Sequence, residues 1–299
     1  MNKGIFLLLV AEFFFALGTV IVKIVTAATP VSGIELTFFR FSTGFVIITT
    51  YILLTGKNIK PIKPFNVYMR GIFNGIAVMF FFMGVEFSNV SKANLLNMTY
   101  PVFVMVLAPF INKEKTGKSI ILYLGTIMAG IYLVIIPANP VSPFSDINKG
   151  DIFALLSALT AGFGISFLRE AGKTNGFHVI IFYLMGIGTL ISGTLAAASF
   201  IIPSGKFLLY ILFMAVISFI GQLFITMGYK YINAAPGSLV SSSRIIFAII
   251  LGVTVFSDPV TLRIITGSVI IIISLAGVNG FFRYLKNKKR MSIIHSSLQ

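Results

Sequence analysis

The chain has 299 residues, of which 57% are hydrophobic and 10% charged, against roughly 25% charged in an average soluble domain. The apolar residues form blocks of about 20, the length needed to cross a bilayer, and this excludes an ordinary soluble protein. The net charge of +15 comes from short segments between these blocks, which favours anionic lipid headgroups over nucleic acid. The absence of cysteine excludes disulfides and thiolate metal sites.

The blocks predict an all-α polytopic membrane protein with ten transmembrane helices. The first block, MNKGIFLLLVAEFFFALG, resembles a signal peptide, but Glu12 interrupts it and no clear cleavage site follows. We therefore expect it to remain as the first span. The predicted spans are 4–25, 34–54, 69–87, 92–111, 119–136, 150–168, 178–201, 207–230, 236–256 and 262–284.

Two connections are longer than the rest, residues 55–68 and 137–149. The second is polar and proline-rich and lies near the middle of the chain, so we interpret it as a linker between two five-helix halves, 4–136 and 150–284. Residues 285–299 form a basic tail. Because each half has an odd number of spans, two homologous halves would be inserted with opposite orientations, as in many secondary transporters.

The distribution of basic residues predicts the orientation. With the N-terminus placed inside, the inner segments carry 16 Lys and Arg residues and the outer segments carry 5. Arg70 is counted among the inner residues, whereas Arg40 and Arg244 lie within spans. The imbalance predicts a protein of the cell membrane (the inner or plasma membrane) with both termini in the cytoplasm.

Several stretches resemble the drug/metabolite transporter superfamily, specifically a tandem pair of EamA-type domains. In the first half these are ELTFFRFSTG, with Arg40, and EFSNVSKANLLNMTYPVFVMVLAPFINKEKTGKSIILYLGTIMAG, in which the mid-span Pro101 precedes Glu114. In the second half, GDIFALLSALTAGFGISF resembles the start of another copy. The segment YINAAPGSLVSSSRIIFAIILGVTVFSDPVTLRIITGSVIII resembles the Pro…Glu stretch, but it lacks the mid-span proline and has Asp258 in place of the glutamate.

The resemblance covers residues 4–284 and implies a transporter of two inverted repeats with no bound cofactor. It further implies that spans 1, 3, 4, 6, 8 and 9 surround a central cavity, while spans 5 and 10 lie at the periphery. Family cargoes include amino acids, other small metabolites, nucleotide sugars and drugs, and many bacterial members are exporters. Aligned by eye, Pro101 of span 4 falls opposite Arg244 of span 9, and Glu114 falls opposite Asp258 after a one-residue gap.

Arg244 is the main candidate for a substrate-binding residue. It lies about 12 Å into span 9 at ~1.5 Å rise per residue, where an isolated guanidinium costs roughly 3 kcal/mol or more. It could bind a substrate carboxylate or phosphate bidentately, or it could form a structural ion pair. Ser242, in the adjacent run of three serines, could add a hydroxyl to the ligand, or serve as a small residue at a helix contact.

Glu12 lies at a similar depth in span 1. A buried carboxyl can carry protons or bind a substrate ammonium, and it could instead simply neutralise Arg244. Asn74, Asn97, Tyr100 and Gln222 are further candidates for substrate binding, because polar groups in hydrocarbon need partners, although interhelical hydrogen bonds are the commoner use. Arg40 is expected to extend to the interface or pair locally, and Glu114 and Asp258 are expected to act as helix caps or topology signals.

No catalytic motif and no metal-ligand cluster is present in the sequence, and no P-loop for ATP hydrolysis. We therefore expect a gradient-driven transporter, not an enzyme, that moves small metabolites by alternating access. Zwitterionic or anionic compounds are favoured, amino acids first, and export is favoured by the family resemblance. The expected partners are the substrate and membrane lipids, with the protein as a monomer or homodimer. The alternatives are an intramembrane enzyme acting on a lipid-linked substrate and a non-transporting channel or assembly subunit.

Overall fold

The computed structural model describes residues 3–88, 90–114, 118–135, 148–197, 200–203, 205–256 and 262–278. Within them the chain forms twelve helical segments, and the backbone is helical almost throughout. The segments are α1 (Lys3–Ala28), α2 (Gly33–Thr55), α3 (Pro64–Phe87), α4 (Val90–Asn97), α5 (Tyr100–Ile111), α6 (Lys118–Ile135), α7 (Lys149–Gly172), α8 (Phe177–Ala196), α9 (Lys206–Gly228), α10 (Ala234–Ser241), α11 (Arg244–Phe256) and α12 (Leu262–Val278).

These segments make ten passages. Eight are long and apolar enough to span a membrane, two of them formed by α4 with α5 and by α10 with α11; α6 and α12 contain shorter apolar stretches. The ten spans expected from the sequence are therefore confirmed, with some boundaries moved: α3 begins at Pro64 and α8 ends at Ala196. Most of the central linker, the tail 285–299 and Asp258 lie outside the described residues.

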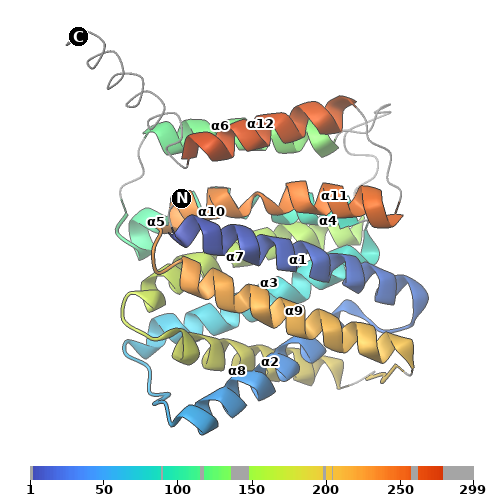
Figure 1. Ribbon diagram of the computed structural model, residues 1–299, viewed down its shortest axis with the longest axis vertical. Coiled ribbons are helices and arrows are strands. Elements are labelled where there is room, and N and C mark those ends of the chain that lie inside the picture. Colours follow the sequence, from blue (N-terminus) through green and yellow to red (C-terminus); the bar gives the residue numbers. More distant parts are fainter. Residues whose placement is uncertain are drawn as a thin grey trace, which may run out of the picture.

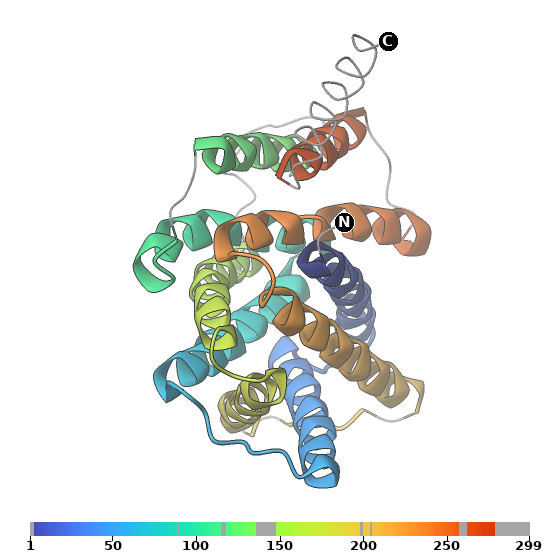
Figure 2. The same cartoon turned by 60° about the vertical axis from the view of Figure 1, so that its left-hand side comes forward.

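The helices run roughly alongside one another and are stacked along the long axis of the molecule, with α6 and α12 at one end and α2 and α8 at the other (Figure 1). Each of these end pairs takes one helix from each half of the chain. The most extensive contacts are those of α3 with α7 and of α1 with α9. Exchanging the two halves converts one of these contacts into the other, as expected for two inverted five-helix repeats. Figure 2 shows the same stacking from a second side.

Local sequence determines where several helices begin and end. Ser32 and Glu35 form a capping box at the start of α2, and Asn148 and Asp151 form one at the start of α7. At the end of α2, Gly56 adopts a left-handed conformation with φ of 59°, which a glycine tolerates without steric cost. Large apolar side chains along the outer helices are exposed, as a lipid-facing surface requires, among them Leu54, Leu122, Leu209 and Ile272.

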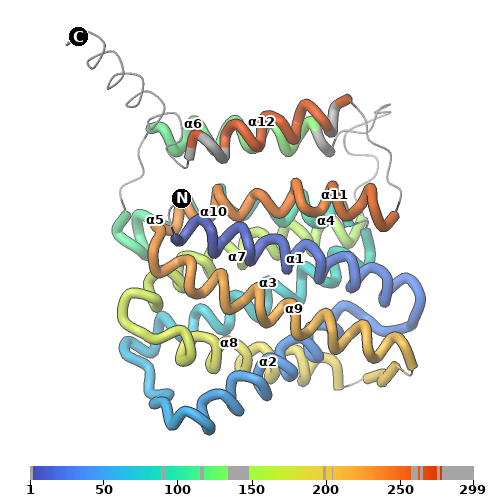
Figure 3. The backbone as a smooth tube through the Cα atoms, viewed as in Figure 1, coloured from blue at the N-terminus to red at the C-terminus, as the bar shows by residue number. Residues whose placement is uncertain are grey.

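The fourth and ninth passages are interrupted in the middle, where the sequence predicts continuous spans 92–111 and 236–256. The fourth breaks between Asn97 and Tyr100, because Pro101 has no N–H to continue the α-helical hydrogen bonds. The ninth breaks at Ser242 and Ser243 without a proline (Figure 3). There the N–H groups of Ser242, Ser243 and Ile245 bond three residues back, which tightens the turn.

The breaks also set the alignment of the repeats. Val90 and Ala234, the first residues of α4 and α10, are 144 positions apart, and so are Tyr100 and Arg244, the first residues of α5 and α11. Arg244 is therefore the counterpart of Tyr100 and not of Pro101, which corrects the alignment by eye. With this offset Glu114 falls opposite Asp258 without a gap.

Candidate substrate cavity

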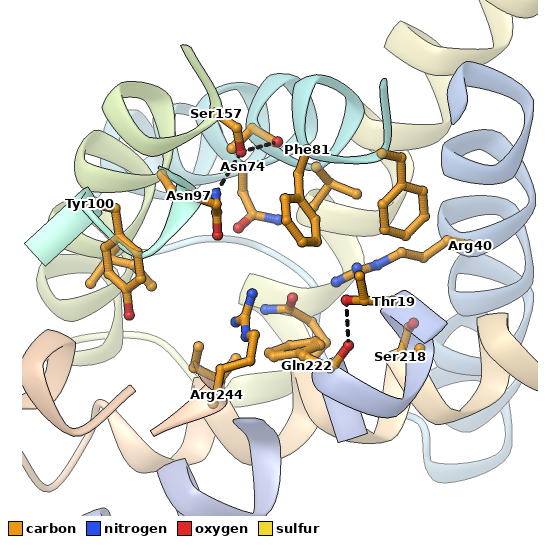
Figure 4. Close-up of a pocket in the computed structure, with 18 of the residues that line it drawn as sticks. Thr19, Arg40, Asn74, Phe81, Asn97, Tyr100, Ser157, Ser218, Gln222 and Arg244 are labelled. Carbon is orange, nitrogen blue, oxygen red and sulfur yellow. Dashed lines mark hydrogen bonds between the residues drawn. The ribbon is translucent and has the colours of Figure 1, made fainter. Parts of the chain in front are cut away.

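A small cavity lies where the two repeats meet, between the interrupted passages and α1, α3, α7 and α9. Its volume is about 70 Å³, space for about two water molecules at ~30 Å³ each and far below the ~300 Å³ or more of usual ligand pockets. Its polar lining residues, most of them shown in Figure 4, are Thr19, Arg40, Arg70, Asn74, Asn97, Tyr100, Ser157, Ser218, Gln222 and Arg244. The helices that correspond to spans 1, 3, 4, 6, 8 and 9 all contribute lining residues, and α2 adds Arg40.

Arg244 points into this cavity and forms an ion pair with Glu12 at its base. Arg244 Nε and Nη2 each lie 2.6 Å from Glu12 Oε2. Glu12 is fully buried, and its second oxygen, Oε1, has no hydrogen-bond partner among the described residues. The pair joins α1 of the first repeat to α11 of the second. Glu12 neutralises part of the charge of Arg244, as a structural ion pair would, and the guanidinium still lines the cavity, as substrate binding requires.

Three hydroxyl groups lie within electrostatic range of Glu12. Ser241, Tyr100 and Tyr229 lie close enough to interact electrostatically with the carboxylate or with one another. Tyr100 also lines the cavity, and its hydroxyl donates to the carbonyl of Ser238 at 3.5 Å. Ser242 is fully buried in the break but, like Glu12, does not line the cavity. A direct contact between Ser242 and a substrate would require the break to rearrange.

The three amide candidates line the cavity in different ways. Asn97 Nδ2 donates to Ser157 Oγ at 2.7 Å, and Ser157 in turn donates to the carbonyl of Ala77 at 2.7 Å (Figure 4). Gln222 Nε2 donates to Thr226 Oγ1 at 3.3 Å. Asn74 Nδ2 is buried with no partner in the described part of the chain. Asn97 and Gln222 therefore act partly in interhelical or local bonding, whereas Asn74 offers a free donor.

Arg40 does not extend to the interface or pair locally as the sequence suggests. Its side chain points into the cavity from α2 (Figure 4) and is only 6% exposed. It lies among aromatic rings, with Cζ 5.2 Å from the centroid of Phe15 and 5.7 Å from that of Phe82. Because Arg244 Cζ is 4.9 Å from the same Phe15 centroid, this ring serves both guanidinium groups through cation–π contacts.

Arg70, which the sequence count treats as an inner loop residue, lies inside α3 and lines the cavity with 1% of its surface exposed. Its Nε and Nη1 atoms have no hydrogen-bond partner among the described residues. The signal for its role is the spacing of Arg70 and Asn74, which are four residues apart and thus on one helix face. We call Arg40, Arg70 and Arg244 the cavity arginines.

One end of the cavity helices is held together by Arg169 of α7. Its Nη1 donates to the carbonyls of Tyr229 and Lys230 at 3.0 and 3.1 Å, and its Nη2 donates to Asn233 Oδ1 at 2.9 Å. Arg169 also pairs with Glu114 at 3.4 Å. Glu114 accepts the backbone N–H of Ala234 at 3.0 Å and so caps α10 of the other repeat. We call this group the Arg169 latch.

The opposite end has a related group built on Lys23 of α1. Lys23 Nζ donates to the carbonyls of Val85 and Ser88 at the end of α3, at 3.2 and 2.7 Å. This Lys23 latch matches the Arg169 latch in form, because each joins the first helix of a repeat to the end of its third. At the same end, Lys92 pairs with Asp151 at 2.7 Å. The counterpart of Glu114 there, Asp258, lies outside the described residues.

An all-helical chain with ten membrane passages, two inverted repeats and a polar cavity at their interface has the architecture of a membrane transporter. A sequence model of the EamA-like transporter family matches residues 2–136 and 148–280. The chain therefore belongs to the EamA-like transporter family. It is an integral membrane transporter and not an enzyme.

Individual relatives are distant but cover most of the chain. The pseudopaline exporter CntI of Pseudomonas aeruginosa (strain UCBPP-PA14) is 22% identical over 92% of this chain and 95% of its own. Human solute carrier family 35 member G1 is 22% identical over 92% and 78%, and the S-adenosylmethionine uptake transporter of Rickettsia prowazekii is 23% identical over 90% and 88%. A crystal structure at 17% identity superimposes with a TM-score of 0.73 over 95% of this chain and 98% of the other, which supports the fold alone.

Proposed function

We propose that this protein is a gradient-driven secondary transporter that carries small metabolites through the central cavity by alternating access. The observation that carries the proposal is the convergence of buried polar and charged side chains from both repeats on one cavity between the membrane-spanning helices. Buried charges cost free energy in a membrane and are used where a substrate path needs them. The absence of a P-loop favours a solute or ion gradient as the energy source.

Substrates would reach the cavity when one latch opens while the other stays closed. Both ends are held by hydrogen bonds in the described conformation, and the cavity between them is small. Opening either end would widen the cavity without breaking the long helix contacts of α3 with α7 and α1 with α9. This proposal retains two repeats, residues 4–136 and 150–284, joined by the linker 137–149.

We further propose export as the direction of transport, in the cell membrane with both termini in the cytoplasm. One relative is named an exporter and another an uptake transporter, and transport assays in everted vesicles distinguish the two directions. The charge imbalance that supports this orientation remains when Arg70 is moved from the inner loops into α3. Because the chain has no cysteine, single cysteines at Lys57 and Lys206 would report the two faces by impermeant labelling.

The test is transport by purified full-length protein in proteoliposomes against a panel of amino acids and other small metabolites, with empty liposomes as background. Arg244→Ala and Glu12→Gln are measured beside wild type at two pH values, and Lys118→Gln on exposed α6 is the matched control for loss of one charge. We expect transport by wild type and the control, and at least a tenfold loss in Arg244→Ala. If no solute moves faster than in empty liposomes, the transporter proposal fails; if Arg244→Ala transports normally, the role of this arginine fails.

A further inference from the structure

The charge around the cavity is strongly unbalanced. Three guanidinium groups line it, from α2, α3 and α11, and Arg40 lies within electrostatic range of both Arg70 and Arg244. Among the described residues, Glu12 is the carboxylate that meets this group, and it is bound by Arg244. The other buried acids, Glu35 and Asp151, belong to the capping boxes of α2 and α7 at the helix ends. The cavity therefore carries an excess of about two positive charges.

Among the residues that line the cavity, the buried polar atoms without a hydrogen-bond partner in the described part of the chain are all donors. They are Arg40 Nε, Arg70 Nε, Arg70 Nη1 and Asn74 Nδ2. A buried donor without a partner costs free energy. These donors need acceptors, which water supplies in the empty cavity and a ligand rich in acceptors supplies when it is bound. Carboxylate and phosphate oxygens are the acceptors that match guanidinium forks.

The aromatic rings beside the arginines compensate their positive charge only in part, and two helix starts add to it. Phe15, Phe41 and Phe82 present ring faces to Arg40, and these cation–π contacts leave the N–H donors unfilled. The helices α5 and α11 both begin at the cavity, with Tyr100 and Arg244 as their first residues. A helix start carries a partial positive charge, so these two starts add to the attraction for anions.

We propose that the substrate is a small organic compound with at least two anionic groups, carboxylate or phosphate, that bridges the cavity arginines. One anionic group is bound by Arg40 and Arg70 and the other by Arg244, with Asn74 donating to the bound anion. This deepens the proposed transport function and rests on it. The assignment narrows the proposed substrates from small metabolites in general to compounds with two anionic groups. A zwitterion with a single carboxylate leaves one or more guanidinium groups without a partner and brings an ammonium into a cationic cavity.

Size does not oppose the proposal. The cavity of about 70 Å³ is too small for any metabolite in the described conformation, so binding of either class requires one latch to open. The long arginine side chains are flexible, so they can stay in contact with a bridging anion as the cavity widens. Charge, and not shape, is therefore the property that the described residues specify.

The test uses compounds that share one skeleton and differ in charge. Proteoliposomes with the full-length chain are assayed for uptake and exchange of succinate, succinamate and succinamide, which carry two, one and no carboxylates. Phosphoglycolate, which carries one phosphate and one carboxylate, tests the phosphate form, and alanine and aspartate test a zwitterion without and with a second carboxylate. We expect succinate, aspartate or phosphoglycolate to move at least tenfold faster than succinamate, succinamide and alanine. Which dianion is preferred distinguishes carboxylate from phosphate.

Variants then connect the preference to the arginines. Arg40→Gln and Arg70→Gln should each raise the apparent KM for the preferred dianion by about 10- to 100-fold, the usual range for losing a charged hydrogen bond, while Lys118→Gln leaves it unchanged. Arg70→Lys keeps the charge and should lose less. If a glutamine variant does not fold, the charge series on wild type still decides, and so does the increase in the unfolding temperature of wild type on adding succinate or phosphoglycolate in detergent.

The outcomes separate the two proposals. Transport of alanine or succinamate in preference to every dianion would overturn the dianion assignment and leave the transport function intact. The assignment is also wrong if a dianion is preferred but Arg40→Gln and Arg70→Gln, when folded, retain the wild-type KM. If none of these compounds, nor any amino acid or metabolite of the wider panel, moves faster than in empty liposomes, both proposals fail.

Discussion

The two interrupted passages occupy equivalent positions, yet their chemistry differs. At the α4–α5 break a proline interrupts the helix, and the nearby contacts are neutral: Asn97 with Ser157, and Tyr100 with a backbone carbonyl. At the α10–α11 break serines replace the proline, and the contact with α1 is the Arg244–Glu12 ion pair. Symmetry thus specifies the cavity and the place of the breaks, whereas the contacts at the two breaks differ in charge. The frame is shared by the repeats, and the buried ion pair belongs to the second break alone among the described residues.

The largest effect is expected from breaking the Arg244–Glu12 pair. Glu12→Gln leaves a buried guanidinium without its counter-ion, and Arg244→Gln leaves a buried carboxylate; losing one partner of a buried pair costs about 3–5 kcal/mol. The unfolding midpoint of either variant in detergent should fall by several degrees. The double variant should be more stable than the sum of the two single losses implies, because no charge is left unpaired.

That double-mutant cycle also tests whether the pair is structural. A double variant that regains both stability and transport would assign the pair to structure alone. Regained stability without transport would keep Arg244 in the substrate path. Additive losses of stability would show that the ion pair is not a major contact at this break.

A smaller effect is expected at the two latches. Arg169→Gln removes contacts with two carbonyls, Asn233 and Glu114, and should destabilise that end by about 1–3 kcal/mol. Lys23→Gln removes bonds to two carbonyls and should cost less, about 1 kcal/mol. Each variant should increase the labelling rate of a cysteine placed at Ser218 in the cavity, from opposite sides of the membrane. Equal increases from the same side would contradict the assignment of one latch to each end.

The sequence predicts the ten spans well because the apolar blocks are long, and it locates Glu12 and Arg244 because a charge inside such a block is conspicuous. It misses Arg70 because the apolar block predicts a third span that begins at residue 69, whereas α3 begins at Pro64 and places Arg70 more than one turn inside the helix. The position of Arg40 near a span end predicts a surface role, and only the fold shows that its guanidinium lies among aromatic rings beside the cavity.

The sequence does not show the second break for a different reason. Without a proline, the run of Ser241, Ser242 and Ser243 has no strong helix-breaking signal, and its tight turn is formed by backbone N–H groups that bond three residues back. The same limit applies to Phe15, one of 31 phenylalanines. From the sequence alone, Phe15 is expected only to make apolar contacts. Its position between the guanidinium groups of Arg40 and Arg244 depends on helices that lie far apart in the sequence.

The smallest effect is expected from Ser157→Ala at the neutral break. The substitution removes the bonds from Asn97 and to the carbonyl of Ala77, and hydrogen bonds between membrane helices are worth about 0.6 kcal/mol on average. The unfolding midpoint in detergent should therefore change far less than in Glu12→Gln, although both sites are fully buried. Transport should persist with a changed KM at most, because the freed Asn97 amide still faces the cavity. A loss of transport in Ser157→Ala as large as that in Glu12→Gln would show that the neutral break contributes as much to function as the charged one.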